Sequence, residues 1–477
     1  MDELKRGKLK DNLIFGIGAL GGLLFGYDTG IVAGAGDLYK FSFSMSQWEE
    51  GFCTASVVLG SAIMALAVGW LSDKFGRKKL LLASSIIFIG GALASAIAPN
   101  FILLCLSRII LGFGVGIASA VVPTYLSELA PAIKRGPIAS LFQSMLIFGI
   151  LLSYISSILL YKGHAGSTVQ TYTGLDWRLM LGSAIIPAII LLFGSMFLPE
   201  SPRFLIKNGQ YDLAKSVLTN LRKGFSEQKI IAELTEIEQI NKLEAKGKIS
   251  DLFKIAKPAF IAACGLIIFN QLVGINSILY YGPTVIRQLF NAGLTGNADK
   301  DALIIQVFLG AINFLGTILT IVIINKRGNK YWLTLGAIGM GAMLLICTLF
   351  DIKVITDPSH GYIIILLIAL YLVFFEISWG PIPWNSVGEL FPLHIRGIGA
   401  SIATSCNWFT NFIIMFLFPV LVGKNADGSP THLYFGFLLF SGFCILACIF
   451  VRYFVPETRG KSLEQIEESF TKKAKLK

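Results

Sequence analysis

Two nine-residue stretches decide how this chain folds: ELAPAIKRG at residues 128–136 and ELFPLHIRG at residues 389–397. Both place Glu-Leu, Pro and Arg-Gly at the same offsets. Both stand between apolar runs of roughly 20 residues, the length of a helix that crosses about 30 Å of hydrocarbon. Of the 477 residues, 54% are hydrophobic and only 14% are charged, whereas soluble domains have about 25% charged residues. The composition disfavours a water-soluble enzyme and predicts an all-α integral membrane protein.

Twelve apolar runs follow one another, six before and six after the polar stretch at 199–258. Because each run is continuous and does not alternate with polar residues, membrane-spanning helices fit better than barrel strands. We predict a six-helix bundle at 1–198, a linker of short helices at 199–258, a second six-helix bundle at 259–455 and a tail at 456–477. The predicted spans are 12–33, 53–72, 80–98, 101–122, 138–160, 179–198, 259–283, 303–324, 331–350, 361–388, 398–423 and 433–451.

Lysine and arginine indicate the orientation of these spans. If both termini are cytoplasmic, 32 of the 40 basic residues lie on the cytoplasmic side and seven on the other side. Cytoplasmic loops of membrane proteins carry such an excess, so we expect a multi-pass protein of the cell membrane with a cytoplasmic linker. The net charge of +11 then reflects topology, and no nucleic-acid partner is expected.

Two further motifs repeat at equivalent loops of the two halves. The sequence Pro199-Glu200-Ser201 after the sixth span recurs as Pro456-Glu457-Thr458 after the twelfth, and the loop at 73–78 has a weaker counterpart at 325–330. A duplicated chain places one cavity between two similar bundles, and that arrangement permits rocking of the bundles around a central site.

The duplicated loops and several motifs inside the spans carry a resemblance to a known family. On these residues the chain resembles the sugar porter family of the major facilitator superfamily over nearly its whole length, and especially the bacterial proton–xylose and proton–glucose symporters. The resemblance implies two pseudo-symmetric bundles that work by alternating access on monosaccharides and related polyols. The motifs are FGYDTG at 25–30, DKFGRK at 73–78, RIILG at 108–112, PESPR at 199–203, NQLVGIN at 270–276, WGPIPW at 379–384 and PETRG at 456–460.

Three ionisable residues lie well inside the predicted spans: Asp28, Arg108 and Glu376. Each costs a few kcal/mol at the membrane midplane, so each needs a partner or a function. Asp28 and Arg108 could form a static ion pair or a proton switch, because burial and a nearby arginine act in opposite directions on the proton affinity of a carboxylate. The resemblance favours the switch, since proton-coupled relatives carry aspartate at the position of Asp28 and facilitators commonly carry asparagine.

The candidate sugar site combines neutral amides with aromatic rings. Amides both donate to and accept from sugar hydroxyls, and an aromatic ring offers a platform for the apolar sugar face. For any one amide taken alone, hydrogen bonding between helices is the alternative. The spans supply Gln143, Asn270, Gln271, Asn276, Asn313, Asn407 and Asn411, with Trp384, Trp408, Tyr280 and Tyr281 nearby in sequence.

The resemblance assigns roles to most of these residues. Asn270 stands where relatives usually have glutamine, and Asn407 occupies a polar position of the eleventh span. Phe25 and Trp408 are expected to wall the cavity, and the apolar Ile150 favours a hexose, or acceptance of both pentoses and hexoses. Positions that match sugar contacts of the family are Gln143, Gln271, Asn276, Asn313 and Trp384.

Glycine and proline interrupt two predicted spans, at Gly274, at Gly282-Pro283 and at 380–383. Proline removes a backbone donor and kinks a helix, so we expect these spans to be mobile gates; a fixed kink shaped by packing is the alternative. Glu376 precedes the last interruption, and we expect it to act in gating. A second proton site and a position at the lipid edge are its alternatives.

Charged residues gather at the cytoplasmic ends of the predicted spans. The resemblance implies that they form ion pairs between helices, which together hold the outward-facing state. Asn325 and Asn329 replace an expected acid and base, so we expect a thinner network in the second half. The charged residues are Asp73, Arg77, Glu128, Arg135, Glu200, Arg203, Glu389, Arg396 and Glu457.

These observations predict a secondary active transporter that imports a monosaccharide by proton symport. A passive sugar facilitator is the alternative, and a sugar sensor is a remote one. We expect no enzymatic activity and no cofactor beyond the proton gradient, since the four histidines are scattered without metal-ligand spacing. The expected partners are a monosaccharide, protons and the lipid bilayer, with the chain working as a monomer.

Overall fold

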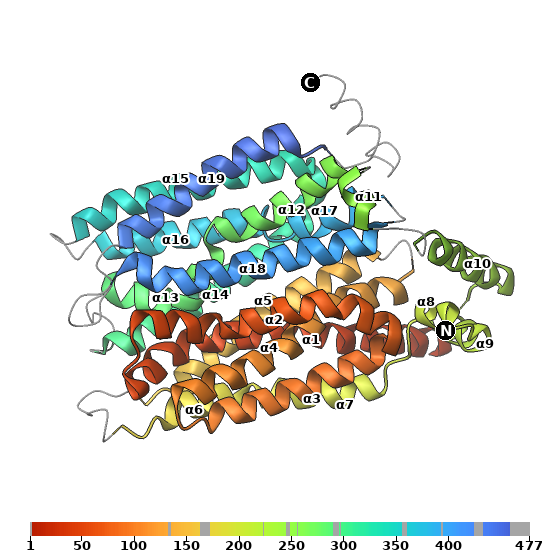
Figure 1. Cartoon of the computed structure of the whole chain (residues 1–477), viewed down its shortest axis with the longest axis horizontal. Helices are drawn as coiled ribbons and strands as arrows, with labels where there is room; N and C mark the ends of the chain where they lie inside the picture. The colour runs from red at the N-terminus through yellow and green to blue at the C-terminus, as the bar shows by residue number, and fades with distance from the viewer. Residues whose placement is uncertain are drawn as a thin grey trace.

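The computed structural model describes residues 2–131, 135–162, 172–222, 224–244, 249–254, 256–289, 295, 297–354, 360–392, 395–423 and 433–457. Side chains at some helix ends, that of Arg135 among them, lie outside this part. Within it the structure is all-helical (Figure 1), as the sequence predicts.

The first half forms a bundle of six crossings. The helix α1 packs on α5 and α4, and α3 packs on α4 and α7. The sixth crossing is made of two short helices that meet at Ala184. The helices are α1 (Asp2–Phe43), α2 (Gln47–Phe75), α3 (Arg77–Ala96), α4 (Phe101–Leu129), α5 (Arg135–Leu160), α6 (Leu175–Ser183) and α7 (Ile185–Met196).

The second half forms a matching bundle. Two of its crossings, the seventh and the tenth of the whole chain, are each divided into two helices, α12 with α13 and α16 with α17. The two bundles meet where α2 packs on α18, α5 on α14 and α1 on α13. The helices are α12 (Lys257–Leu272), α13 (Ile275–Leu289), α14 (Ala298–Ile323), α15 (Asn329–Val354), α16 (His360–Glu376), α17 (Ile382–Leu390), α18 (Arg396–Val422) and α19 (Leu433–Phe454), with the short 3₁₀ helix η2 (Ile324–Lys326) after α14.

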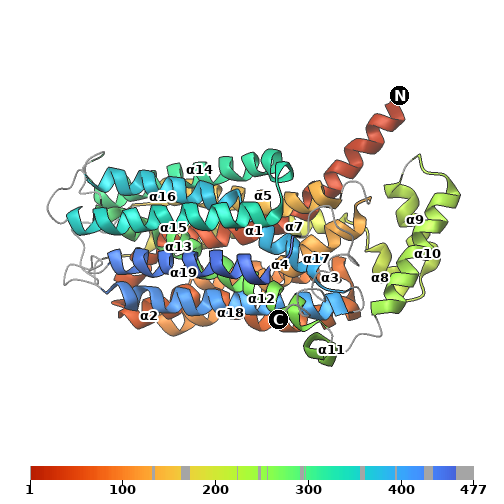
Figure 2. The ribbon, with the colours of Figure 1, turned by 90° about the horizontal axis from the view of Figure 1, so that it is seen from above.

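Four short helices occupy the predicted linker: α8 (Pro202–Lys207), α9 (Tyr211–Leu221), α10 (Glu227–Glu244) and α11 (Ile249–Lys254). The first three lie beyond the bundles, at the end where α1 begins (Figures 1 and 2). We call this the linker end and the opposite one the far end.

A hydrogen bond from Lys215 of α9 lowers the pKa of the Glu227 carboxyl at the start of α10.

The positions of the membrane-crossing helices agree with the hydropathy pattern, although most of these helices extend beyond the ends of the apolar runs. Eleven helical segments of the described chain are long and apolar enough to cross a membrane, and the shorter Gly361–Glu376 adds a twelfth crossing. The extra turns are stabilised by capping side chains. At the start of α2, for example, Ser46 accepts from the Glu49 backbone N–H while the Glu49 carboxylate accepts from the Ser46 backbone N–H.

Two of the three predicted interruptions are present. The chain leaves the helix at Gly274, whose φ is +96°, and between Glu376 and Ile382. The prediction at Gly282-Pro283 is wrong, because α13 continues through Pro283. Proline at 283 cannot donate to the carbonyl of Leu279. The Tyr154 hydroxyl of the first bundle donates to that carbonyl instead, at 3.0 Å.

Candidate functional site

A network of buried amides lies where the two divided spans of the second bundle approach α18. The Nε2 atom of Gln271 donates to Oδ1 of Asn270 at 2.8 Å and to Oδ1 of Asn407 at 2.7 Å. The Oε1 atom of Gln271 accepts from Nδ2 of Asn276 at 2.6 Å. Gln271, Asn270 and Asn407 are buried, and Asn276 is half-buried. Gln271 is therefore the centre of a closed set of neutral donors and acceptors.

The helix breaks explain why these residues meet. Gln271 lies in the last turn of α12 and Asn276 in the first turn of α13, so the turn at Gly274 brings the two side chains together. A Cβ at Gly274 would lie 2.5 Å from the Phe440 ring and would need a left-handed backbone, so glycine is required there. The break after α16 frees the carbonyl of Trp379, which accepts from Nδ2 of Asn270 at 2.6 Å.

Aromatic residues of the two bundles contact each other at Trp408, the residue after Asn407 in α18. The rings of Phe25 in α1 and Trp408 in α18 have centroids 5.3 Å apart, at an interplanar angle of 50°. The Nε1 atom of Trp408 is buried and has no hydrogen-bond partner among the described residues. The Tyr280 hydroxyl reaches Oγ1 of Thr29 at 3.5 Å. These contacts cross from one bundle to the other.

Three other predicted sugar-site residues are not hydrogen-bonded to the network in the part of the chain that the structure covers. Gln143 is half-buried on α5, and Trp384 is 37% exposed on α17. Asn313 of α14 is fully buried, and neither polar atom of its side chain has a hydrogen-bond partner among the residues that the structure describes. A buried amide without partners costs about 1–3 kcal/mol per group.

Glu376 is buried at the end of α16 and is held by α14. The Thr317 hydroxyl lies 3.0 Å from Oε2 of Glu376, and the Thr320 hydroxyl donates to its backbone carbonyl at 2.8 Å. That carbonyl is free because Gly380, the residue four positions on, donates to Phe375 instead. Both threonines were missed in the sequence reasoning, since a hydroxyl in an apolar span usually bonds its own helix.

Asp28 and Arg108 are both buried inside the first bundle, with 2% and 0% of their surface exposed. They interact electrostatically, but the described residues show no ion-pair contact between them. The Nε, Nη1 and Nη2 atoms of Arg108 are all without a hydrogen-bond partner there. A closed static pair is therefore not the arrangement seen, and the Arg108 guanidinium can still accept a hydrogen-bond partner.

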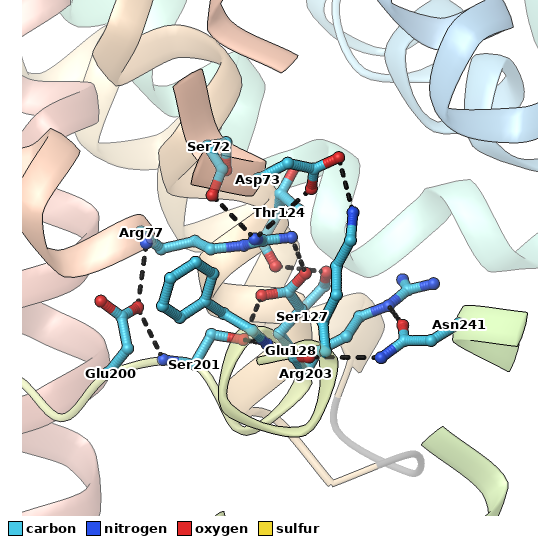
Figure 3. Close-up of polar contacts among 12 residues, drawn as sticks. Ser72, Asp73, Arg77, Thr124, Ser127, Glu128, Glu200, Ser201, Arg203 and Asn241 are labelled. Carbon is cyan, nitrogen blue, oxygen red and sulfur yellow. Dashed lines mark hydrogen bonds and ion pairs between the residues drawn. The ribbon is translucent and has the colours of Figure 1, made fainter. Parts of the chain in front are cut away.

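At the linker end, Arg77 of α3 joins three elements (Figure 3). Its Nη2 lies 2.9 Å from Oε1 of Glu128 in α4, and its Nη1 donates to the carbonyl of Ser72 in α2 at 3.1 Å. The Ser201 hydroxyl donates to the other oxygen of Glu128, and Lys207 of α8 pairs with Asp73 at 2.8 Å. The first bundle and the start of the linker are thereby tied together.

Two of the duplicated motifs contact each other, and they do so in both halves. The Glu200 carboxylate accepts from the backbone N–H of Arg77 at 2.9 Å, at the N-terminus of α3. The Glu457 carboxylate accepts from the backbone N–H of Asn329 at 2.9 Å, at the N-terminus of α15. A carboxylate is favourable at a helix N-terminus because free N–H groups and the helix dipole meet it there.

Lysines repeat the same symmetry. Lys78 donates to the carbonyl of Met196 at the end of α7, and Lys330 donates to that of Arg452 near the end of α19, both at 2.8 Å. In each half, the loop after the second crossing is therefore bonded to the end of the sixth.

The remaining members of the predicted network are more scattered. Nε of Arg203 donates to Asn241 of α10 at 3.0 Å, and Nε of Arg396 donates to the carbonyl of Phe391 at 3.5 Å. Glu389 is exposed near the end of α17. The Arg135 and Asn325 side chains lie outside the described residues, so the predicted thinning of the second network remains a prediction.

Comparison with known proteins agrees with this arrangement. Residues 15–470 match the model of a family described as "Sugar (and other) transporter". A D-xylose transporter of Levilactobacillus brevis is 40% identical, over 98% of this chain and 97% of the relative. The glucose transporter GlcP of Staphylococcus epidermidis is 37% identical, over 96% and 97%.

Solved structures of sugar transporters that are 30% identical in sequence also align with this chain. The E. coli xylose transporter XylE in a partially occluded inward-open conformation aligns with a TM-score of 0.79, covering 95% of this chain and 99% of that one. The proton:xylose symporter XylE bound to 6-bromo-6-deoxy-D-glucose also aligns with a TM-score of 0.79, covering 96% and 98%.

Proposed function

This chain belongs to the sugar transporter family of the major facilitator superfamily, and on that premise we propose that it imports a monosaccharide by proton symport through alternating access. It is a multi-pass membrane protein and not an enzyme. The observation that carries the proposal is the amide network around Gln271, together with the contact between Phe25 of one bundle and Trp408, the neighbour of Asn407 in sequence, of the other. Neutral amides and an aromatic wall are the chemistry that a polyhydroxylated ring requires.

Sugar recognition follows from the bonding capacity of these residues. The four amides bond one another, and sugar hydroxyls can replace those bonds one for one without exposing a charge. The Asn313 amide and Nε1 of Trp408 are buried and have no hydrogen-bond partner within the described part of the chain, and a sugar hydroxyl would satisfy each. The buried apolar side chain of Ile150 favours a hexose, or both hexoses and pentoses. XylE, a proton:xylose symporter seen with a glucose analogue, is consistent with that range.

Proton coupling is assigned to Asp28 and Arg108. Asp28 lies on α1, three residues after Phe25. A change in the protonation state of Asp28 can therefore move the same helix that carries the aromatic ring of Phe25. While Asp28 is ionised, the buried guanidinium of Arg108 attracts it; a proton removes that attraction. The bundles then rock with sugar and proton bound, and release both on the other side.

The linker end is cytoplasmic in this proposal, which places both termini and α8–α10 inside the cell. The units are the bundles at 1–198 and 259–455, the linker at 199–258 and the tail at 456–477. The protein works as a monomer in the plasma membrane and needs no cofactor other than the proton gradient. Glu376, at the hinge between α16 and α17, acts in gating.

The test uses purified protein in proteoliposomes with an imposed proton gradient. Asp28→Asn should abolish uphill sugar accumulation but keep sugar exchange, because asparagine occupies the site without titrating. Asp212→Asn, a matched change on an exposed position of α9, should leave both unchanged. Undiminished uphill uptake by Asp28→Asn contradicts the assignment.

A second measurement separates symport from the alternative of passive facilitation. Sugar added to de-energised cells that produce the wild-type protein should make the medium more alkaline, since protons enter with the sugar. Sugar uptake without alkalinisation identifies a facilitator. A competition panel of glucose, xylose, galactose, arabinose and inositol then ranks the substrates.

A further inference from the structure

A group of charged residues at the far end joins the two bundles, and no motif of the sequence indicates it. Nη2 of Arg287, near the end of α13, lies 2.8 Å from Oδ2 of Asp37 in α1. Nη1 of the same side chain lies 2.6 Å from Oδ1 of Asp299 in α14. One guanidinium therefore holds two carboxylates, one from each bundle, in the forked geometry that suits arginine.

Two neutral groups extend this far-end cluster. The Thr284 hydroxyl of α13 donates to Oδ2 of Asp37 at 3.0 Å, and the Tyr161 hydroxyl after α5 donates to Oδ2 of Asp299 at 3.0 Å. The charged side chains are only 20–30% exposed, so salt screens them less than a fully exposed pair. The cluster lines a small hollow together with Ala33 and Leu303.

Arg287 lies far along α13 from the turn at Gly274. It lies 13 residues after Gly274, about 20 Å along a helix, and α13 is separated from α12 by that glycine. A contact near the end of α13 therefore decides whether the far half of the seventh crossing stays against α1.

We propose that Arg287, Asp37 and Asp299 form a gate at the far end that holds α13 against α1 and closes the cavity on that side. Asp299 belongs to the same bundle as Arg287, whereas Asp37 belongs to the other. Opening breaks the contacts of Asp37 with Arg287 and Thr284, and that of Tyr161 with Asp299. The pair of Arg287 with Asp299 stays intact and keeps the guanidinium aligned for closure. These are positioning residues, which touch neither the sugar nor the proton site.

The proposal rests on alternating access, with the far end extracellular. Its test is side-chain accessibility in intact cells, which needs no sugar transport. Ala33→Cys places a reporter in the hollow beside Asp37, where Ala33 is 5% exposed. Lys300→Cys, at an exposed position of α14, gives the reference labelling rate for the same end. A membrane-impermeant maleimide is the probe, and the chain with its native cysteines alone gives the background.

Asp37→Asn should raise the labelling rate of Ala33→Cys by roughly two- to five-fold, the range expected for loss of a partly exposed ion pair. Asp37→Glu keeps the charge and should stay near the wild-type rate. Asp299→Asn should have a smaller effect, since it removes the contact within one bundle. Sugar affinity in detergent should be unchanged in all three.

Equal labelling of Ala33→Cys in the Asp37→Asn and wild-type backgrounds, with Lys300→Cys labelled, overturns the gate. A rise in Asp37→Glu equal to that in Asp37→Asn overturns it as well, because packing and not charge would then be responsible. A chain that shows the labelling pattern but moves no sugar refutes the transport function and leaves the gate standing.

Discussion

At the scale of single residues, removal of the contact between Thr317 and Glu376 tests the hinge between α16 and α17. Thr317→Val keeps the shape of the side chain and removes the hydroxyl that lies 3.0 Å from the buried carboxyl. Hydrogen bonds between membrane helices contribute about 1 kcal/mol, so we expect a lower melting temperature in detergent and slower transport. Thr348→Val is the matched control, because that buried hydroxyl donates to the Leu344 carbonyl of its own helix and to no other described residue. An equal loss in both variants contradicts a special role for Thr317.

The same scale shows what one sequence can reveal about a side chain. Glu376 stands out because a carboxyl in an apolar span is costly, and the amides stand out because they are polar. The partners of Glu376 do not stand out, since Thr317 and Thr320 look like helix-bonded hydroxyls until the packing of α14 on α16 is known. The sequence predicts that Gln271 contacts the sugar. It does not predict that Gln271 is the centre of an amide network, because that arrangement depends on the geometry of the helix breaks.

At the scale of elements, the turn between α12 and α13 decides the geometry of the site. Gly274→Ala introduces a side chain at φ +96° and 2.5 Å from the Phe440 ring, so we expect a loss of more than about 2 kcal/mol of stability. Gly442→Ala, inside α19 with open space around it, should be neutral or stabilising by up to about 1 kcal/mol. Thermal unfolding of the two variants in detergent measures the difference. Similar melting temperatures would show that the turn tolerates a side chain.

The elements also show where sequence reasoning succeeds and where it fails. Spans follow from apolar length, so their positions are largely predictable. Helix ends are not, since the span predicted to start at residue 53 begins as a helix at Gln47, after the cap Ser46. The sequence predicts an interruption at Pro283, because proline lacks a backbone donor. The helix continues since Tyr154 of the other bundle supplies the missing donor, and a contact between bundles is not visible from a local pattern.

At the scale of the whole molecule, transport requires the far ends of α1 and α13 to separate. Asp37→Cys combined with Thr284→Cys places two thiols where the native side chains are 3.0 Å apart. We expect oxidation to stop sugar uptake and a reductant to restore it, while each single variant responds to neither. Proteolysis in the linker separates the halves on a denaturing gel unless the disulfide holds them, which verifies the cross-link. A cross-linked protein that still transports sugar contradicts the required separation.

The two-bundle architecture could be predicted because duplication leaves a trace in the loops. The repeats at 128–136 and 389–397 and those around Glu200 and Glu457 stand at equivalent positions. What the repeats do could not be predicted, since Glu200 and Glu457 act on backbone N–H groups that any residue supplies. The far-end cluster has no repeat in the sequence, because Asp37 of α1 and Arg287 of α13 lie on equivalent crossings of the two halves but carry opposite charges.

The contacts of Glu200 and Lys78, and those of Glu457 and Lys330, each stay within one half of the chain. A half taken from a relative therefore carries its own helix caps with it, and recombination at the linker preserves them in either parent. The contact at the far end, by contrast, needs an acid at position 37 from one parent and a base at position 287 from the other. Chimeric transporters assembled from this chain should therefore keep that pair matched.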